Sequence, residues 1–272
     1  SGGNAYRHYM LTASDGSSQQ VYCVESGIAY NASDNTYTSE SGTNSNYLNL
    51  LHSEARRGIT LTAIYGWKPG ASLPVSGINE DDYKMATQII LWEYQQQLRS
   101  DPYSRHGNGQ ANADQYFSVI AGRPAEKAYN WILSQVASHS TVPSFTSTKK
   151  SEAPELELKW DTEKKVYTLT VTDTNNLKID LETLKGSGVS ATRSGNKYTF
   201  TSKNMIMDPV TFEFRKDIPV ANDMLIWGRP GYQTMMTGAS DPLSFYVKGK
   251  TETYGTARIV KTSEDGIVSG IR

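Results

Sequence analysis

Cys23 is the only cysteine of the 272 residues, and its thiol is the side chain with the most direct covalent chemistry. A single cysteine excludes an intramolecular disulfide and a cysteine-rich zinc site. The surrounding run VYCVE (residues 21–25) alternates, which predicts a strand with Val21 and Cys23 on one face and Tyr22 and Val24 on the other. Taken alone, the residue is either a small buried apolar side chain or a nucleophile.

A cysteine hydrolase would need an imidazole beside the thiol. Cys23 is predicted on a strand and not at a helix N-terminus, where a thiol pKa is lowered, so the sequence argues against this class. The histidines show no HExxH or similar spacing, and we expect no structural metal. The four histidines are His8, His52, His106 and His139.

Gln88 is the second candidate for chemistry. It lies in NEDDYKMATQIILWEYQQQLRS (residues 79–100), which predicts a helix, and Met85, Leu91 and Trp92 share its face. A carboxamide within an apolar stripe is either a buried side chain satisfied by hydrogen bonds or a reacting group. The other polar side chains of this helix predict an ordinary solvated face: Glu93 and Gln95 to Gln97.

The two candidates belong to motifs that resemble a known family. Tyr22-Cys23-Val24 and Thr87-Gln88-Ile89-Ile90-Leu91-Trp92 resemble the aromatic-Cys-aliphatic and TQxxxW motifs of thioester domains in Gram-positive surface adhesins. Ile90 stands where that family often has alanine. The resemblance covers about residues 5–140 and implies an α+β domain in which the Cys23 sulfur and the Gln88 side-chain carbonyl condense, releasing ammonia. It implies supporting positions for Tyr22, Thr87, Leu91 and Trp92.

The resemblance also implies a function. A thioester is a stored electrophile, so an amine, such as a lysine side chain of a host protein, can attack it and form an amide on Gln88. Such a protein is a single-turnover covalent adhesin, not an enzyme, and it needs no cofactor. The donor to the reacting carbonyl stays open between Tyr22, Thr87 and a backbone N–H. Glu25 is either a base for the incoming amine or a plain exposed acid, and we favour the exposed acid.

A rival interpretation remains open at this point. The chain could be a reversible binding module for a host ligand, with Cys23 a buried free thiol and Gln88 a structural amide. The covalent interpretation predicts that Cys23→Ala abolishes amine incorporation with little change in fold, whereas the rival predicts unchanged binding.

Helical patterns fall within residues 1–145, which we predict to be the thioester domain. Gly58 is expected to end the first helix, and Asn79 to cap the second. We expect Trp67 and Trp131 in the core of this domain. The predicted helices cover residues 45–57, 79–100 and 122–139.

Short alternating strands replace the helical patterns after a linker at residues 141–155, and they predict an antiparallel β-sandwich at 146–258. Trp160 and Trp227 are expected in its core. Lys159 could form an intramolecular isopeptide bond of the kind found in adhesin stalks, but we favour an outward-facing strand lysine.

The final segment, residues 259–272, predicts a strand, a turn at Asp265-Gly266 and a second strand. Its run IVKTSEDGIVSGI resembles the opening of the prealbumin-like repeats of adhesin stalks. That resemblance implies an isopeptide bond at Lys261, with its partner asparagine beyond the end of this chain. We therefore expect the monomeric tip of a longer, cell-wall-anchored surface protein.

The composition and net charge disfavour some classes of binding partner. The formal net charge is −1 and the pI is about 6.4, which disfavours a nucleic-acid groove or a polybasic membrane surface. No apolar run is long enough for membrane insertion. Tyrosine outnumbers phenylalanine by 17 to 6, which favours an extracellular, β-rich surface. The expected partner is a host cell-surface or matrix protein, reached through a lysine amine.

Overall fold

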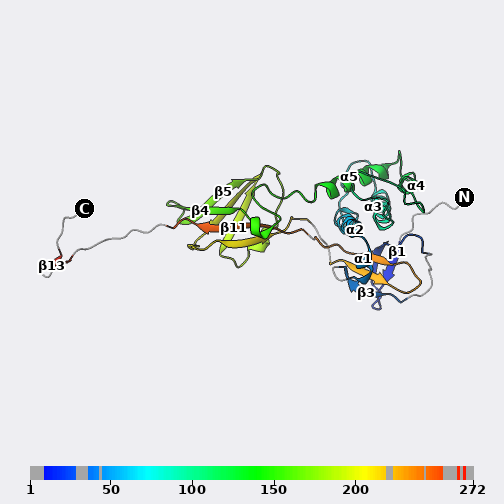
Figure 1. Ribbon diagram of the computed structural model, residues 1–272, viewed down its shortest axis with the longest axis horizontal. Helices are drawn as coiled ribbons and strands as arrows, with labels where there is room; N and C mark the ends of the chain where they lie inside the picture. Colours follow the sequence, from blue (N-terminus) through cyan, green and yellow to red (C-terminus); the bar gives the residue numbers. More distant parts are fainter. Residues whose placement is uncertain are drawn as a thin grey trace. The chain divides into compact units, whose positions relative to one another are not determined.

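The chain forms two compact units in the computed structural model (Figure 1). One unit combines helices with a sheet and the other is built from strands, which confirms the predicted α+β and all-β classes. The first unit consists of Ser1–Val142 and Arg215–Ser244, and the second of Pro143–Phe214 and Phe245–Arg272. The structure describes residues 9–28, 36–42, 45–218, 223–241 and 243–253, and the backbone of 262–263 and 266–267.

The sheet of the first unit has five strands in the order β1-β2-β10-β9-β3, and all its pairs are antiparallel. Two neighbouring strands from beyond residue 220 are therefore inserted between strands from the beginning of the chain. The strands are β1 (Tyr9–Thr12), β2 (Ser18–Cys23), β3 (Thr38–Ser41), β9 (Leu225–Gly228) and β10 (Met235–Thr237).

Helices from the described residues form a second layer against this sheet, and the short first helix lies beside the strands (Figure 1). The predicted cap is confirmed: the Asn79 side chain accepts from the Asp82 backbone N–H, and the Asp82 carboxylate accepts from that of Asn79. The helices are α1 (Asn46–Leu50), α2 (Ser53–Tyr65), α3 (Glu80–Gln95), α4 (Ala113–Phe117) and α5 (Pro124–Ser138).

Gly58 does not end a helix, so that prediction is wrong. The predicted helix over residues 45–57 is two helices, and the second, α2, runs through Gly58 to Tyr65. A Cβ atom at Gly58 would lie 2.1 Å from the Tyr94 ring of α3. The glycine is therefore required for close helix packing, and the local sequence carries no sign of that.

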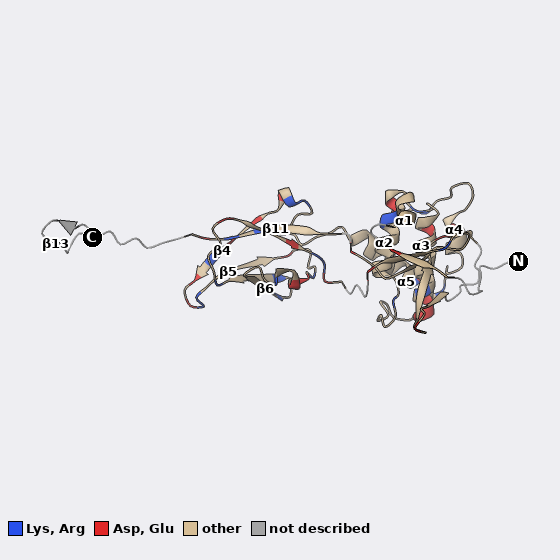
Figure 2. Cartoon of the chain, turned by 90° about the horizontal axis from the view of Figure 1, so that it is seen from below, with Lys and Arg blue, Asp and Glu red and all other residues tan. Residues whose placement is uncertain are grey.

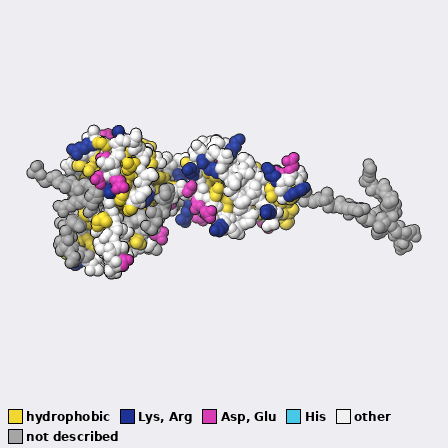
Figure 3. All heavy atoms as spheres, turned by 180° about the vertical axis from the view of Figure 1, so that it is seen from behind, with side chains coloured by type: hydrophobic (Ala, Val, Ile, Leu, Met, Phe, Trp, Pro, Cys, Tyr) yellow, Lys and Arg dark blue, Asp and Glu magenta, His cyan; other side chains and the backbone are white. Residues whose placement is uncertain are grey.

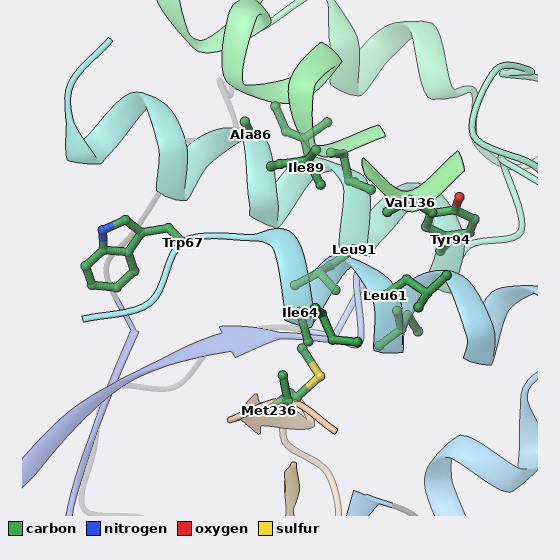
Figure 4. Packing of buried hydrophobic residues seen from close by; sticks show 14 of the residues in the cluster. Leu61, Ile64, Trp67, Ala86, Ile89, Leu91, Tyr94, Val136 and Met236 are labelled. Carbon is green, nitrogen blue, oxygen red and sulfur yellow. The ribbon is translucent and has the colours of Figure 1, made fainter. Parts of the chain in front are cut away.

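A single apolar cluster joins the helices to the sheet (Figure 4). Leu61 and Ile64 of α2 face Leu91 of α3, and Met236 of β10 points toward them from the sheet. Trp67 is buried in this cluster and Trp131 packs against it, as predicted. The largest buried area of the first unit therefore holds α3 and β10 in fixed positions, and both carry neighbours of the candidate site.

The structure divides the chain differently from the predicted continuous domains 1–145 and 146–258. Residues 215–244 return to the first unit, where β9 and β10 complete its sheet. Trp227 lies in β9 and packs against the Cys23 side of that sheet, so its assignment to the second domain is wrong. These residues fell within the predicted sandwich at 146–258, but a strand pattern does not specify which sheet a strand joins.

The strands of the second unit follow the order β6-β7-β5-β4-β11-β8. β4 links two parts of this arrangement, because residues 155–158 pair with β11 and residues 159–161 pair with β5. The β4–β11 pair is parallel, which departs from the predicted antiparallel pattern. The strands are β4 (Glu155–Asp161), β5 (Val166–Thr172), β6 (Val189–Ser194), β7 (Lys197–Ser202), β8 (Val210–Phe214) and β11 (Phe245–Thr251).

Lys159 of the second unit points outward, as favoured. Its side chain is 59% exposed and its Nζ lies 2.5 Å from Glu157 Oε2. Across both units, acidic and basic residues are scattered through the described chain, and on the face in Figure 3 the two signs are interspersed (Figures 2 and 3).

The final segment has two short antiparallel strands, β12 (Thr262–Ser263) and β13 (Gly266–Ile267), in agreement with the two predicted strands. Of the predicted turn, Asp265 lies outside the described residues and Gly266 belongs to β13. Lys261 lies outside the described residues. Within the described parts of the chain, no helix has both the length and the apolar character required to cross a membrane.

Candidate functional site

Cys23 is the last residue of β2 and is completely buried. It pairs with Met235 of β10, while β1 pairs with the preceding part of β2 up to Val21. The predicted alternation is confirmed, because Val21 and Cys23 share a small apolar cluster with Tyr9 and Met235. The sulfur therefore lies among apolar side chains on the face of the sheet opposite to Val24.

Gln88 lies in the middle of α3 and is 1% exposed. Its carboxamide pairs with the backbone of Cys23 through two hydrogen bonds. Gln88 Oε1 accepts from the Cys23 N–H at 3.0 Å, and Gln88 Nε2 donates to the Cys23 carbonyl at 2.7 Å. The fold thus joins two residues that are 65 positions apart in the sequence, and it orients both ends of the carboxamide.

The environment of the Cys23 sulfur favours its neutral form. Burial raises the pKa of the Cys23 thiol, and the negative charge of Glu25 acts in the same direction. Backbone hydrogen bonding near Glu25 and the Trp92 indole N–H oppose these effects without cancelling them. The resting thiol is therefore protonated at neutral pH and protected from oxidants by its burial.

Tyr22 and Thr87 fasten the turn after α2 instead of facing the reacting groups. The Tyr22 hydroxyl donates to the Trp67 carbonyl at 2.9 Å. The Thr87 hydroxyl accepts from the Trp67 N–H at 3.0 Å and donates to the Tyr83 carbonyl at 2.8 Å. Of the three donors that the sequence left open, the backbone N–H of Cys23 lies 3.0 Å from the Gln88 carbonyl oxygen.

Leu91 and Trp92 lie on different sides of the site. Leu91 is fully buried in the main core, whereas Trp92 packs against the cluster that contains Cys23. The Trp92 ring also contacts the ring of Tyr116, with 5.7 Å between centroids. Trp92 therefore forms an apolar wall beside Cys23. Leu91 packs on the side of α3 that faces the main core.

A cavity of about 100 Å³ lies against Gln88 between α3 and the α4 region. Leu91 is not among the residues that line it. Its walls are Met85, Gln88, Ile89, Trp92, Gln115, Tyr116 and Val119.

The predicted solvated face at the polar end of α3 is confirmed only for Gln97, which is exposed, whereas Gln95 and Gln96 are half-buried. Gln95 Oε1 accepts from the Ser26 N–H, and Gln96 Nε2 donates to the Ser26 carbonyl, both at 2.9 Å. The Ser26 hydroxyl also lies 2.8 Å from that of Tyr116. These contacts hold the segment that follows Cys23 against α3.

Glu93, predicted as solvated, is completely buried. Its carboxylate accepts from Arg99 Nε at 3.0 Å and from the Tyr129 hydroxyl at 2.8 and 2.9 Å. Burial raises the pKa of Glu93, while Arg99 and the Tyr129 hydroxyl lower it. A charge at the end of a helix usually lies in water, and only the distant partners Arg99 and Tyr129 explain its burial.

Glu25 is half-buried, not a plain exposed acid. Its Oε2 accepts from the Thr234 backbone N–H at 2.9 Å and from the Thr234 hydroxyl at 2.7 Å. The carboxylate therefore fastens the segment after β2 to the segment before β10. Thr234, Met235 and Tyr116 escaped the sequence analysis because nothing local connects them with Cys23.

The histidines of the described chain do not contact Cys23. His139 is buried between the Tyr65 hydroxyl, 2.8 Å from Nδ1, and Asp241 Oδ1, 3.0 Å from Nε2. His139 and Asp241 line a separate cavity of about 530 Å³. His52 and His106 are exposed, and His8 lies outside the described residues. No group of three potential metal-ligating side chains occurs in the described ranges.

Comparison with known proteins identifies the fold around this site. Residues 20–138 match the family model described as thioester domain, a stretch that includes Cys23 and Gln88 but ends before β9 and β10. No curated protein matches the chain. Among solved structures, the thioester domain of the Staphylococcus aureus TIE protein is 18% identical, with a TM-score of 0.53 over 86% of this chain and 83% of that chain.

Two further solved structures align less closely. The Bacillus anthracis TIE protein is 10% identical, with a TM-score of 0.37 over 95% of this chain and 52% of that chain. A pilus-presented adhesin is 12% identical, with a TM-score of 0.34 over 90% of this chain and 73% of that chain. The likeness of fold therefore rests on the first of the three structures.

Proposed function

We propose, for a chain that contains a thioester domain, that Cys23 and Gln88 condense into an internal thioester that captures amines covalently. The observation that carries the proposal is the two-point pairing of the Gln88 carboxamide with the backbone of Cys23. Cys23 carries the only thiol of the chain. The pairing holds this residue next to the carboxamide carbon of Gln88 in a buried, apolar site.

The condensation balances without a co-reactant. The Cys23 sulfur attacks Gln88 Cδ, the new C–S bond forms, and the C–N bond breaks. The thiol proton passes to the leaving nitrogen, which departs as ammonia. The Cys23 backbone N–H, at 3.0 Å from Gln88 Oε1, is placed to stabilise the negative charge that develops on that oxygen.

Capture reverses the roles of sulfur and nitrogen. The nitrogen of a neutral primary amine attacks Gln88 Cδ, the C–S bond breaks, and an amine proton passes to the Cys23 sulfur. The products are a secondary amide on Gln88 and a free thiol. Since the amide does not regenerate the starting state at a useful rate, the protein acts once per molecule and is not a turnover enzyme.

The burial of the site supports storage of such a bond. Water is the competing nucleophile, and apolar walls limit its access to a reactive carbonyl. Trp92 and Met235 beside Cys23, and Met85 beside Gln88, provide such walls. The small cavity next to Gln88 offers an incoming amine a route to the site.

The biological role that we propose is covalent adhesion. The chain would act at the tip of a cell-wall-anchored surface protein, outside the cell, and join a lysine of a host surface or matrix protein. The thioester domain supports this role, because a stored electrophile needs an amine-bearing partner. A covalent link would also resist shear.

The intact mass of freshly purified protein tests the proposal, beside Cys23→Ala and Gln88→Glu. The wild type is expected to lack the mass of one ammonia, and methylamine is expected to remove the deficit by adding one amine. Both variants are expected to match their unmodified masses. Gln135→Glu on α5 is a matched control, expected to keep the deficit.

Two other outcomes would redirect the proposal. A deficit that persists in Cys23→Ala would place a condensation elsewhere in the chain. A wild-type mass equal to the unmodified sequence would favour the reversible binding module, because the two hydrogen bonds at Gln88 also satisfy a purely structural carboxamide.

A further inference from the structure

The cavity beside Gln88 differs from the rest of the site in being a space that another molecule can enter. Gln88 forms part of its wall although only 1% of this residue is exposed. The incoming nitrogen must reach the Gln88 carbonyl carbon, so the dimensions and chemistry of this cavity decide which amines react. This reasoning rests on the proposed function and adds a selectivity to it.

The lining of the cavity contains no carboxylate and no basic group. Met85, Ile89 and Val119 contribute aliphatic surface, and Trp92 and Tyr116 contribute ring surface. An ammonium ion entering this space would lose its hydration without gaining a counter-charge, whereas a neutral amine with an alkyl stem would not. The lining therefore favours the unprotonated form, which is also the reactive nucleophile.

The volume of the cavity limits the shape of the amine. An apolar cavity of roughly 150 Å³ holds a benzene ring, and this cavity of about 100 Å³ is smaller. A slender chain of methylenes fits such a space, whereas a ring or a carbon that is branched beside the nitrogen does not. Close packing makes the difference of a single methyl group measurable.

The outer wall of the cavity is held in place from two sides. The Tyr116 ring lies against Trp92 of α3, with 5.7 Å between centroids, and its hydroxyl lies 2.8 Å from that of Ser26 after β2. The Asn112 side chain caps the short helix α4 by accepting from the Asp114 N–H at 2.9 Å. A wall fixed at these points can discriminate by shape.

We infer that the cavity formed by α3 and the α4 region is an amine-binding subsite that selects primary amines with an unbranched alkyl stem over branched or aromatic ones. A lysine side chain has such a stem, with four methylenes before its nitrogen. Met85 of α3 and Val119 of the turn after α4 both line the subsite.

The test compares the rates at which n-butylamine, tert-butylamine and benzylamine open the thioester, followed by intact mass. Each rate is divided by the rate of the same amine with a small soluble thioester, which removes differences in intrinsic nucleophilicity. The wild type is expected to prefer n-butylamine by about tenfold or more, the effect of one misfitting group in an apolar pocket.

Two variants move the selectivity in opposite directions. Met85→Ala widens the cavity and is expected to raise the normalised rates of the branched and aromatic amines, whereas Val119→Phe fills it and is expected to slow n-butylamine more than methylamine. Val171→Phe in β5 of the second unit is the matched control and is expected to change neither.

The outcomes separate this inference from the proposed function. A missing ammonia deficit before any amine is added contradicts the proposed function itself. A deficit that is present, with equal normalised rates for the three amines in the wild type or unchanged ratios in both cavity variants, overturns the subsite. Methylamine opening of each variant shows that its thioester has formed.

Discussion

The buried polar sites at His139 and at Gln88, both in the first unit, differ in how their hydrogen-bonding groups are used. At His139, both ring nitrogens are engaged, by Tyr65 and by Asp241, although a cavity of about 530 Å³ adjoins them. At Gln88, both ends of the carboxamide bind one backbone residue, and the sulfur of that residue stays among apolar groups.

This difference shows that cavity size does not indicate where chemistry occurs. The larger cavity adjoins an imidazole with no ring nitrogen left to act as a base. The smaller cavity adjoins Gln88, whose electrophilic carbon is held beside the residue that carries the nucleophile, Cys23. The His139 site therefore serves to fasten the fold, and the Gln88 site is the one with reactive potential.

Both sites depend on the returning segment 215–244, so its removal has the largest expected effect. A chain that ends at residue 145 lacks Met235 beside Cys23 and Asp241 beside His139. We expect it to lose cooperative unfolding and amine incorporation together, as measured by thermal circular dichroism and intact mass. A truncated chain that unfolds cooperatively and carries the ammonia deficit would show that the segment is dispensable for both sites.

The second prediction concerns the thiol alone. In Gln88→Met no thioester can form, while the buried environment of Cys23 is kept. Because burial raises the pKa of the thiol, the thiolate is disfavoured and its fraction increases only as the pH rises above the ordinary value of about 8.5. Alkylation by iodoacetamide at pH 8 is expected to be at least about tenfold slower than that of free cysteine.

The pH profile of this alkylation provides the check. The rate should still be increasing at pH 9, where that of free cysteine levels off. A profile that levels off below pH 8 would mean that the site activates the thiol, and it would revive the cysteine hydrolase that the sequence disfavours.

The third prediction separates the contribution of His139 to stability from thioester formation at Gln88. His139→Ala leaves Asp241 and the Tyr65 hydroxyl without their buried partner, so the free energy of unfolding should fall by about 1–3 kcal/mol. The ammonia deficit should persist in the folded variant, since no contact links His139 with Gln88. Urea unfolding and intact mass measure the two effects, with exposed His106→Ala as a control expected to stay within about 0.5 kcal/mol. Loss of the deficit in a folded His139→Ala protein would contradict the division of roles.

The smallest expected effect comes from a matched pair of tyrosines. Tyr22→Phe and Tyr65→Phe each remove one hydroxyl contact, to Trp67 and to His139, and each should cost about 0.5–1.5 kcal/mol. Neither should reduce methylamine opening, because the donor at the reacting carbonyl is the Cys23 N–H. If Tyr22→Phe alone slows the opening by about tenfold, its hydroxyl takes part in the chemistry.

The sequence was sufficient to predict the parts of the site that depend on local patterns. Alternation around Cys23 and the apolar stripe around Gln88 gave the correct faces of β2 and α3, and the Asn79 cap was visible from residue types. The meeting of Cys23 with Gln88 came only from the family motifs, because residues so far apart carry no local sign of contact.

The errors share one physical cause, which is that their explanations lie in tertiary partners. Glu93 is buried because Arg99 pairs with its charge and Tyr129 donates to it, and Gly58 continues a helix because Tyr94 packs on it. Trp227 was assigned to the wrong unit because a strand pattern does not reveal its neighbour in the sheet.

The order in which the chain visits its two units determines how tension would travel through them. Residues 143–214 leave the first unit and return to it, so both their ends are attached to the same body. A pull between Gln88 and the chain beyond Thr251 therefore passes from the first unit directly along β11. The rest of the second unit stays outside this load path, attached to β11 through β4 and β8, and it would not need to unfold for the force to be transmitted.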